Sequence, residues 1–183
     1  KLWMIYSPKL KLNKMAFTYL DEPVRYNEGK VDWTLLPWDG DLLEKLSWEL
    51  KDIANNTSRE NDADDIFASL FDKDIFHVLC YSLLAMQQSS YLPKSNKTSE
   101  LPWTALEQVC RVFAYGAEVK YSRDNYKLSP GLPLEGYIQS MWRHLVQYLR
   151  GEEVDIESKL PHLSHLACNC FMYLWTQKEY HTK

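Results

Sequence analysis

The sequence is poor in residues that favour strands and tight turns. Its 183 residues include only six glycines, and runs that alternate β-branched with polar residues are rare. Several long segments instead repeat apolar residues every three or four positions, which is the spacing of one face of an α-helix. We therefore predict an all-α fold, a compact helical bundle.

An apolar run long enough to span a bilayer is also missing, and no signal peptide is evident. The four cysteines form no CxxC pair; they are Cys80, Cys110, Cys168 and Cys170. We interpret them as reduced thiols, and we expect a cytoplasmic protein without a membrane partner.

The chain has no excess of positive charge. Lysine and arginine number 21 against 25 acidic residues, which gives a net charge of −4. Such a field repels nucleic acid backbones and anionic membranes, so we expect no nucleic acid polymer as a partner. A polyanionic ligand must then be held locally, by a metal ion or by a few placed cations.

The length suits one domain with a sizeable core, and we expect residues 1–183 to form a single one. The tripeptide Leu-Pro-Trp occurs at 36–38 and again at 101–103, and we interpret the residues between the two copies as an insertion of two helices. The expected parts are an N-terminal extension over 1–20, a lead-in over 21–38, the insertion over 39–100, and core helices over 101–183.

Amphipathic patterns place the helices within these parts. Polar or proline-containing stretches separate the patterns. The predicted helices cover residues 41–53, 63–87, 103–121, 134–150 and 161–177.

The last predicted helix carries a polar stripe on an otherwise apolar surface. At 100° per residue, His162, His165 and Asn169 lie within about 60° of one another. The stripe needs partners, because each unpaired buried polar group costs roughly 1–3 kcal/mol. The partners are either protein groups in a buried hydrogen-bonded network or a ligand.

Neighbouring segments supply groups that favour a ligand. Three acidic residues, Glu152, Asp155 and Glu157, precede the helix, and His144 lies on the helix before them. Imidazoles mixed with carboxylates suit Mg²⁺, Mn²⁺ or another first-row divalent ion better than a structural zinc ion. We therefore predict a metal site formed by His144, Glu152, Asp155, His162, His165 and Asn169.

Other residues suit a phosphorylated nucleotide. Arg143 and Lys120 are candidate phosphate clamps. The rings of Tyr115, Tyr121 and Tyr126 offer faces on which a base can stack. A single tyrosine at helical spacing is more often a packing residue, so the prediction depends on the group as a whole.

These residues belong to a set of short motifs. The motifs are Tyr115-Gly116-Ala117, Lys120-Tyr121, Asn125-Tyr126, Arg143-His144, Gly151-Glu152, Asp155 to Ser158, and His162 to Asn169. With them, about 75 C-terminal residues and the stretch RYNEGKVDWTLLP at 25–37 resemble the N-terminal domain of phage-type dATP/dGTP diphosphohydrolases, which are related to the all-α, MazG-like nucleotide pyrophosphohydrolases. In that family the lead-in runs directly into the YGA helix, so the resemblance also implies that 39–100 is an insertion.

The resemblance implies a metal-dependent hydrolase that splits a purine (deoxy)nucleoside triphosphate into a monophosphate and pyrophosphate, with Mg²⁺ or Mn²⁺. It implies catalytic roles for Glu152, Asp155 and His165, and substrate binding by Lys120, Arg143, Tyr115, Tyr121, Asn125 and Tyr126. It also implies a homo-oligomer, and a host-cytoplasmic location if a phage encodes the chain. The MazG-like E-x-x-E helix motif is absent from this sequence.

Two alternatives use the same residues differently. The pocket could hold a nucleotide without hydrolysing it, as a sequestering module or a phage counter-defence protein. The histidines and carboxylates could instead form a purely structural network, with the acidic insertion mediating assembly.

Overall fold

The structure, a computed structural model, describes residues 30–37, 40–56, 62–89, 101–128 and 132–181. The compact unit of the chain begins at Val31. The expected N-terminal extension over 1–20 and the lead-in up to residue 29 lie outside the described residues.

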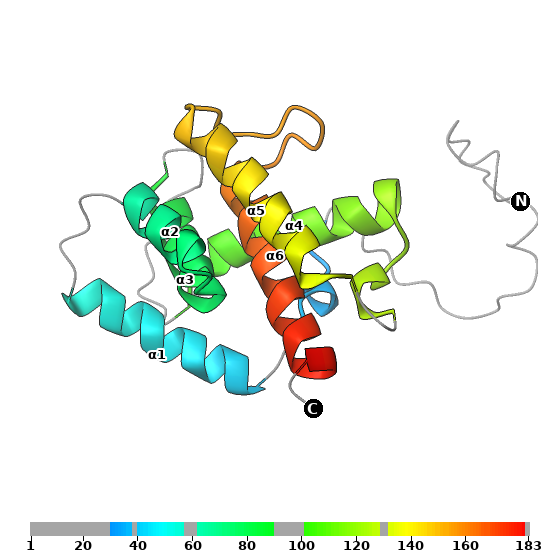
Figure 1. Cartoon of the computed structure of the whole chain (residues 1–183). Helices are drawn as coiled ribbons and strands as arrows, with labels where there is room; N and C mark the ends of the chain where they lie inside the picture. The colour runs from blue at the N-terminus through cyan, green and yellow to red at the C-terminus, as the bar shows by residue number, and fades with distance from the viewer. Residues whose placement is uncertain (1–29, 38–39, 57–61, 90–100, 129–131, 182–183) are drawn as a thin grey trace, which may run out of the picture. The chain divides into compact units, whose positions relative to one another are not determined.

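Six α-helices make up most of the described chain, and no β-strand is present in these ranges, so the fold is all-α as predicted. In chain order they are α1 (Gly40–Asn56), α2 (Asp62–Phe71), α3 (Ile75–Gln88), α4 (Trp103–Tyr115), α5 (Leu134–Leu149) and α6 (His162–Thr176) (Figure 1). Short π-helical turns, Gly116–Lys120 and Gln177–His181, continue α4 and α6. In the part of the chain described, no helix combines the length and the apolar character needed to cross a bilayer.

Helix α6 forms the centre of the bundle. It packs against α3, α4 and α5, and twelve of its fifteen residues are buried. Figure 1 shows α5 running antiparallel to α6. Leu166, Cys170 and Phe171 are fully or almost fully buried, and burial of a large apolar side chain contributes about 1.5–3 kcal/mol. The central position predicted for this helix is confirmed.

The single helix predicted over 63–87 is wrong, because the structure divides it into α2 and α3. Lys73 adopts a left-handed conformation with φ of 60°. The amide of Lys73 donates to Leu70 O, and the amide of Asp74 donates to Ser69 O, which is the Schellman pattern that ends a helix. The Asp74 carboxylate then accepts from the amide of His77 and caps α3. Lysine stands where glycine usually marks such an end, so no local signal predicted the break.

The segment expected to be an insertion contains three helices rather than two. Of these, α3 packs directly on α6 and on α4. Its residues Val78, Leu79 and Leu83 have no exposed surface. The segment therefore contributes one helix to the core of the bundle.

The described end of the lead-in is fastened to the loop after α4. Leu35 and Leu36 are buried next to α4. Arg123 donates from Nη1 to the Asp32 carboxylate at 2.8 Å and from Nη2 to the Thr34 hydroxyl at 2.6 Å. This connection helps to position the loop at 121–128, which forms one side of the pocket described below.

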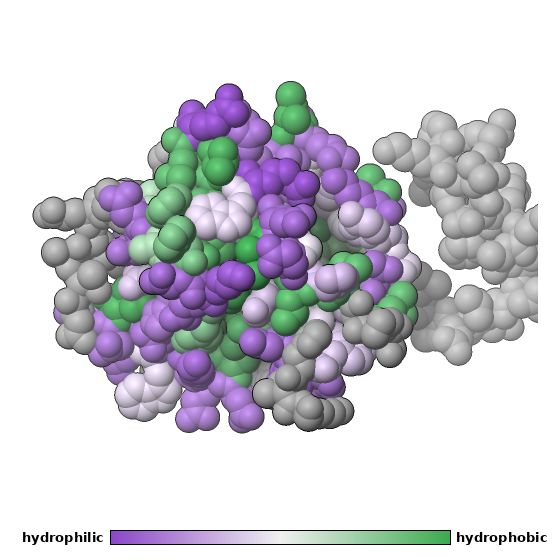
Figure 2. Space-filling view, in the orientation of Figure 1, coloured by the Kyte–Doolittle hydropathy of each residue, from purple (hydrophilic) through white to green (hydrophobic). Residues whose placement is uncertain are grey.

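Helices α2 and α5 together expose an apolar face. Phe67, Phe71, Val146 and Leu149 are between 45% and 71% exposed. Trp142 joins the two helices through an edge-to-face contact with Phe67, with ring centroids 5.3 Å apart. Figure 2 shows apolar and aromatic side chains gathered in the upper left of the view, over α2 and the end of α5. These five residues are called the α2/α5 face.

His77 connects α1 to the start of α3. Its Nδ1 lies 2.7 Å from Asp74 Oδ2, and its Nε2 lies 3.1 Å from Glu49 Oε1. Burial lowers the pKa of His77, but the two carboxylates outweigh burial and the net pKa is raised. The protonated imidazole therefore stabilises the folded chain.

We predict that this contribution is present below pH about 6.5, the pKa of an unfolded histidine, and is lost as pH rises through the higher folded-state pKa. The pair is about one-third exposed, so the effect is at most about 1 kcal/mol. Urea unfolding of the native chain and of His77→Gln at several pH values checks it. The difference in free energy of unfolding between the two should shrink as pH rises, and a constant difference would contradict the prediction.

Candidate functional site

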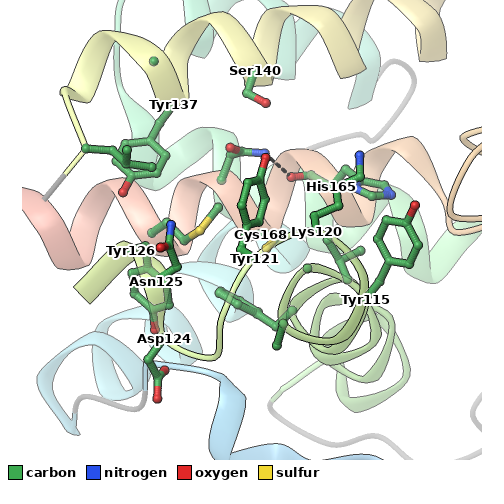
Figure 3. A pocket seen from close by; sticks show the side chains of 18 of the residues that line it. Tyr115, Lys120, Tyr121, Asp124, Asn125, Tyr126, Tyr137, Ser140, His165 and Cys168 are labelled. Atoms are coloured by element: carbon green, nitrogen blue, oxygen red, sulfur yellow. Dashed lines mark hydrogen bonds between the residues drawn. The ribbon is translucent and has the colours of Figure 1, made fainter. Parts of the chain in front are cut away.

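A pocket of about 470 Å³ opens between the end of α4, the loop at 121–128, α5 and α6. Figure 3 shows its two ends. Tyr115, Lys120 and His165 lie at one end, and Asp124, Asn125 and Tyr126 lie at the other. We call the end with Lys120 and His165 the polar end, and the end with Tyr126 the aromatic end.

Two cations face the polar end. Lys120 Nζ lies 2.7 Å from Glu157 Oε2 and 5.5 Å from the centroid of the Tyr115 ring. Arg143 donates from Nη2 to the Ser140 hydroxyl at 2.7 Å. The Lys120–Glu157 pair is exposed and so contributes little to stability. Both cations can therefore turn toward an anionic ligand at low cost.

The tyrosines have different environments. Tyr126 is buried between Phe113 and Trp175, with ring centroids 5.6 Å and 5.4 Å away. Its buried hydroxyl has no hydrogen-bond partner among the described residues. Tyr121 is 66% exposed, so its ring is free to move against a bound ligand. Tyr126 is a fixed wall of the pocket, and Tyr121 is a mobile one.

Three histidines meet beside the polar end. The rings of His144 and His165 are stacked, with centroids 4.6 Å apart and planes 13° apart. Nδ1 of His144 lies 3.0 Å from Nδ1 of His162. Only one of these two nitrogens can carry the shared proton, and Nε2 of His162 is buried without a partner among the described residues.

Burial keeps these imidazoles neutral. Burial, together with the neighbouring histidines and Arg143, lowers the pKa of His144 to about 3. Burial likewise lowers the pKa of His165 to about 4, although Asp155 partly opposes it. The pKa of His162 is lowered by burial and raised in part by Asp155 and Glu152. At neutral pH each ring therefore keeps one unprotonated nitrogen.

The loop between α5 and α6 holds the acidic residues in place. Its two ends pair at Val154 and Pro161. The Asp155 carboxylate accepts from the amides of Glu157 at 3.2 Å and Ser158 at 2.8 Å. The Ser158 hydroxyl in turn lies 2.7 Å from Nε2 of His165. The loop thus connects a carboxylate to the histidine of the pocket through a serine.

The structure brings most of the predicted residues together. Nine of them line the pocket: Tyr115, Lys120, Tyr121, Asn125, Tyr126, Arg143, His144, His165 and Asn169. His162 does not line the pocket, but its Nδ1 lies 3.0 Å from Nδ1 of His144, which does. Asp155 is bonded to the amide of Ser158 and does not line the pocket, and Glu152 is exposed in the same loop.

Sequence reasoning missed other residues of the site. Tyr137 and Ser140 on α5 line the pocket, and the Tyr137 hydroxyl is 3.3 Å from the hydroxyl of Thr176. Ser158 was recognised only as part of a motif. Serine and tyrosine are common on helices and loops, and only the position of Asp155 three residues earlier could have pointed to Ser158.

The six residues of the predicted metal site do not converge on one point. The Nδ2 group of Asn169 donates a hydrogen bond to the backbone oxygen of His165 at 2.8 Å. The Asp155 carboxylate accepts a hydrogen bond from the amide of Ser158 in its own loop. Across the described ranges, no three histidine, cysteine, aspartate or glutamate side chains are placed to hold a metal ion. These protein donors alone do not fit a resident divalent cation, so the six-residue metal site stays a prediction.

Comparison with known proteins gives one match. A family model described as dATP/dGTP diphosphohydrolase, N-terminal, matches residues 87–183, which is just over half of the chain and includes every residue of the pocket except Leu35. No curated protein and no solved structure matches.

The neutral histidines make the fold sensitive to acid. Their folded-state pKa values lie below the unfolded value of about 6.5, so stability is full above pH 6.5 and falls as pH drops toward the folded-state values. We expect protonation of His144 and of His165 in the unfolded chain each to lower the free energy of unfolding by about 1–2 kcal/mol between pH 7 and pH 5.

Urea unfolding at these two pH values measures the loss. His144→Gln should show a smaller loss than the native chain, whereas His77→Gln should not reduce it. An equal loss in the native chain and His144→Gln would contradict this assignment.

Proposed function

Since the chain belongs to the family of dATP/dGTP diphosphohydrolase N-terminal domains, we propose that it hydrolyses a purine (deoxy)nucleoside triphosphate to a monophosphate and pyrophosphate. The observation that carries the proposal is the division of the pocket. Lys120 and the neutral His165 lie at its polar end, and Tyr126 and Asn125 lie at its aromatic end. Arg143 also lines the pocket and acts electrostatically on the pocket residue His144. A nucleotide has the same division between phosphates and base.

The polar end suits the phosphates. Lys120 and Arg143 supply hydrogen-bond donors for phosphate oxygens. They also offset the negative charge that grows on these oxygens during phosphoryl transfer. Their present partners, Glu157 and Ser140, are exchangeable surface groups.

The aromatic end suits the base. Tyr126 provides a fixed ring, which packs between Phe113 and Trp175. The amide of Asn125 offers a donor and an acceptor in the same region. Tyr121, which is exposed, can close over a base by stacking.

His165 is the proposed base. In the proposed reaction, His165 takes a proton from a water molecule that attacks the α-phosphorus. The bond from this phosphorus to the oxygen that bridges to the β-phosphate breaks, and pyrophosphate leaves with its electron pair. Because its pKa is lowered by burial, His165 is unprotonated and ready for this role at neutral pH.

Mg²⁺ sites commonly use one or two carboxylates together with substrate phosphates rather than a complete protein cage. Glu157, next to Lys120, and Glu152, in the loop before α6, would be the carboxylates that hold Mg²⁺ or Mn²⁺ together with the substrate phosphates, and the ion would offset the phosphate charge. Nucleotide substrates and buried, unpaired cysteines both fit the cytoplasmic location proposed for this chain.

A non-catalytic sequestering module is the second candidate. Two observations favour it. The Asp155 carboxylate is bonded to the amide of Ser158 in its own loop, and no three metal donors converge among the described residues. The same pocket would then bind the nucleotide and release it unchanged.

Product analysis separates the two functions. The protein is incubated with individual purine and pyrimidine triphosphates and Mg²⁺ or Mn²⁺, and products are resolved by chromatography. Pyrophosphate and a purine monophosphate are expected. Stoichiometric binding with the triphosphate recovered intact would replace hydrolysis with sequestration, and neither binding nor turnover would overturn both candidates.

Substitution of Lys120 tests the phosphate end. Lys120→Ala removes a charge-assisted contact, which is worth about 1.5–3 kcal/mol. We therefore expect nucleotide affinity, measured by calorimetry with a triphosphate, to fall by roughly 10- to 100-fold. Lys51→Ala, on the exposed side of α1, has the same charge change away from the pocket and should bind normally. Equal affinities for the two variants would remove Lys120 from the site.

The homo-oligomer is proposed to form through the α2/α5 face. Charges of both signs flank it, since Asp72 follows Phe71 and Arg150 follows Leu149, and both are exposed. Neither makes an ion pair among the described residues. A two-fold axis would pair Asp72 of one copy with Arg150 of the other while burying the apolar residues.

We predict a dimer by sedimentation equilibrium at micromolar concentration. Phe71→Glu places a charge in the proposed interface and should give monomers, because burying an unpaired charge is unfavourable. Lys51→Glu introduces the same side chain elsewhere on the surface and should remain dimeric. A monomeric native chain, or a dimer that tolerates Phe71→Glu, would exclude this interface.

A further inference from the structure

We propose that Gly136 is a specificity-determining residue of the pocket, where the missing side chain leaves room for a base with two rings. The inference rests on the proposed function in one respect, because it takes a nucleotide to be the ligand. It names the residue that selects a purine over a pyrimidine.

Gly136 lies on the side of α5 that faces the pocket. It is the third residue of the helix, and it lines the pocket together with Ser140, Arg143 and His144. At 100° per residue, these four positions fall within about 100° of one another around the helix. A side chain at position 136 would therefore project from the same side as three side chains that form the pocket wall.

The start of α5 belongs to the aromatic end of the pocket. Figure 3 shows Tyr137, the residue after Gly136, near Asn125. His144 stacks on His165 of the polar end, and it follows Gly136 by eight residues, which is about 12 Å along a helix. Gly136 is thus placed where the base of a nucleotide is proposed to bind.

Nothing in the described chain requires glycine at this position. Among the described glycines only Gly151 has a positive φ, and a Cβ added to Gly136 would meet no described atom within 4 Å. The amide of Gly136 already donates to Pro133 O at 2.9 Å. Alanine favours a helix more than glycine does, so the stability of α5 does not account for the glycine.

The neighbouring walls of the pocket have little freedom to make room. The ring of Tyr126 is packed against Phe113 and Trp175. Tyr137 is only 3% exposed, and its hydroxyl lies 3.3 Å from that of Thr176. Because these rings are held, the space beside the backbone of α5 depends on the absent side chain. Glycine lets a ligand approach the backbone closely, and a purine needs more of this space than a pyrimidine.

Thermal unfolding separates a requirement of the fold from a requirement of the ligand. Gly136→Ala should raise Tm by about 1–4 °C in the absence of nucleotide, because alanine is compatible with the helical backbone. Gly40→Ala is the matched control. Gly40 begins α1, an added Cβ there also meets no described atom within 4 Å, and it does not line the pocket.

Calorimetry with the α,β-methylene analogues of dGTP and dCTP measures base selection, since these analogues cannot be split at the proposed bond. Gly136→Ala should weaken binding of the dGTP analogue by about 10- to 100-fold, because a methyl group forced into occupied space is unfavourable. The dCTP analogue should lose less than about threefold, since a single ring leaves the methyl group room. Gly40→Ala should bind both as the native chain does.

Three results would overturn this role for Gly136. They are native affinity for both analogues in Gly136→Ala, equal losses for the two analogues, and a lowered Tm, which would show that the fold itself needs the glycine. A native chain that binds neither analogue would overturn the proposed function as well. Native binding that Gly136→Ala leaves unchanged would remove only the role of Gly136.

Discussion

The polar stripe buried on the central helix α6 must find hydrogen-bond partners, and the surrounding helices and loop are arranged to supply them. Helix α6 is enclosed by α3, α4 and α5, yet it carries His162, His165 and Asn169 on one side. Groups of this kind destabilise a core unless they are paired. The chain supplies partners from the loop before α6, from His144 on α5, and from the backbone of α6 itself.

This solution also shapes the pocket. The histidines are desolvated enough to stay neutral, while Lys120 and Arg143 remain close to solvent at the same end. Because the side chains of Lys120 and Arg143 are exposed, their charges do not carry the cost of burial. The polar end of the pocket therefore combines positive charge with neutral imidazole nitrogens. The aromatic end is formed by the loop at 121–128, which Arg123 holds against Asp32 of the lead-in.

Much of the helical architecture could be predicted, because apolar spacing is strong in the helices that pack on α6. The helices expected over 134–150 and 161–177 agree closely with α5 and α6. The break between α2 and α3 could not be predicted, because a lysine does not signal the left-handed conformation that Lys73 adopts. The residues of the candidate site could largely be predicted from their types and spacing, and nine of the predicted residues line the pocket. Ser158 could not be predicted, because its hydrogen bonds with Asp155 and His165 depend on how the loop folds.

The helical class, the central place of the last helix and the set of polar and aromatic residues near it follow from the sequence, because these depend on periodicity and composition along one segment. Which of these residues meet follows from the way the helices pack. Residues from α4, α5, α6 and two loops converge on one pocket, while Asp155 and His162 are placed behind it and Glu152 outside it. Such distances depend on how helices pack and how loops close, and a one-dimensional pattern does not contain them.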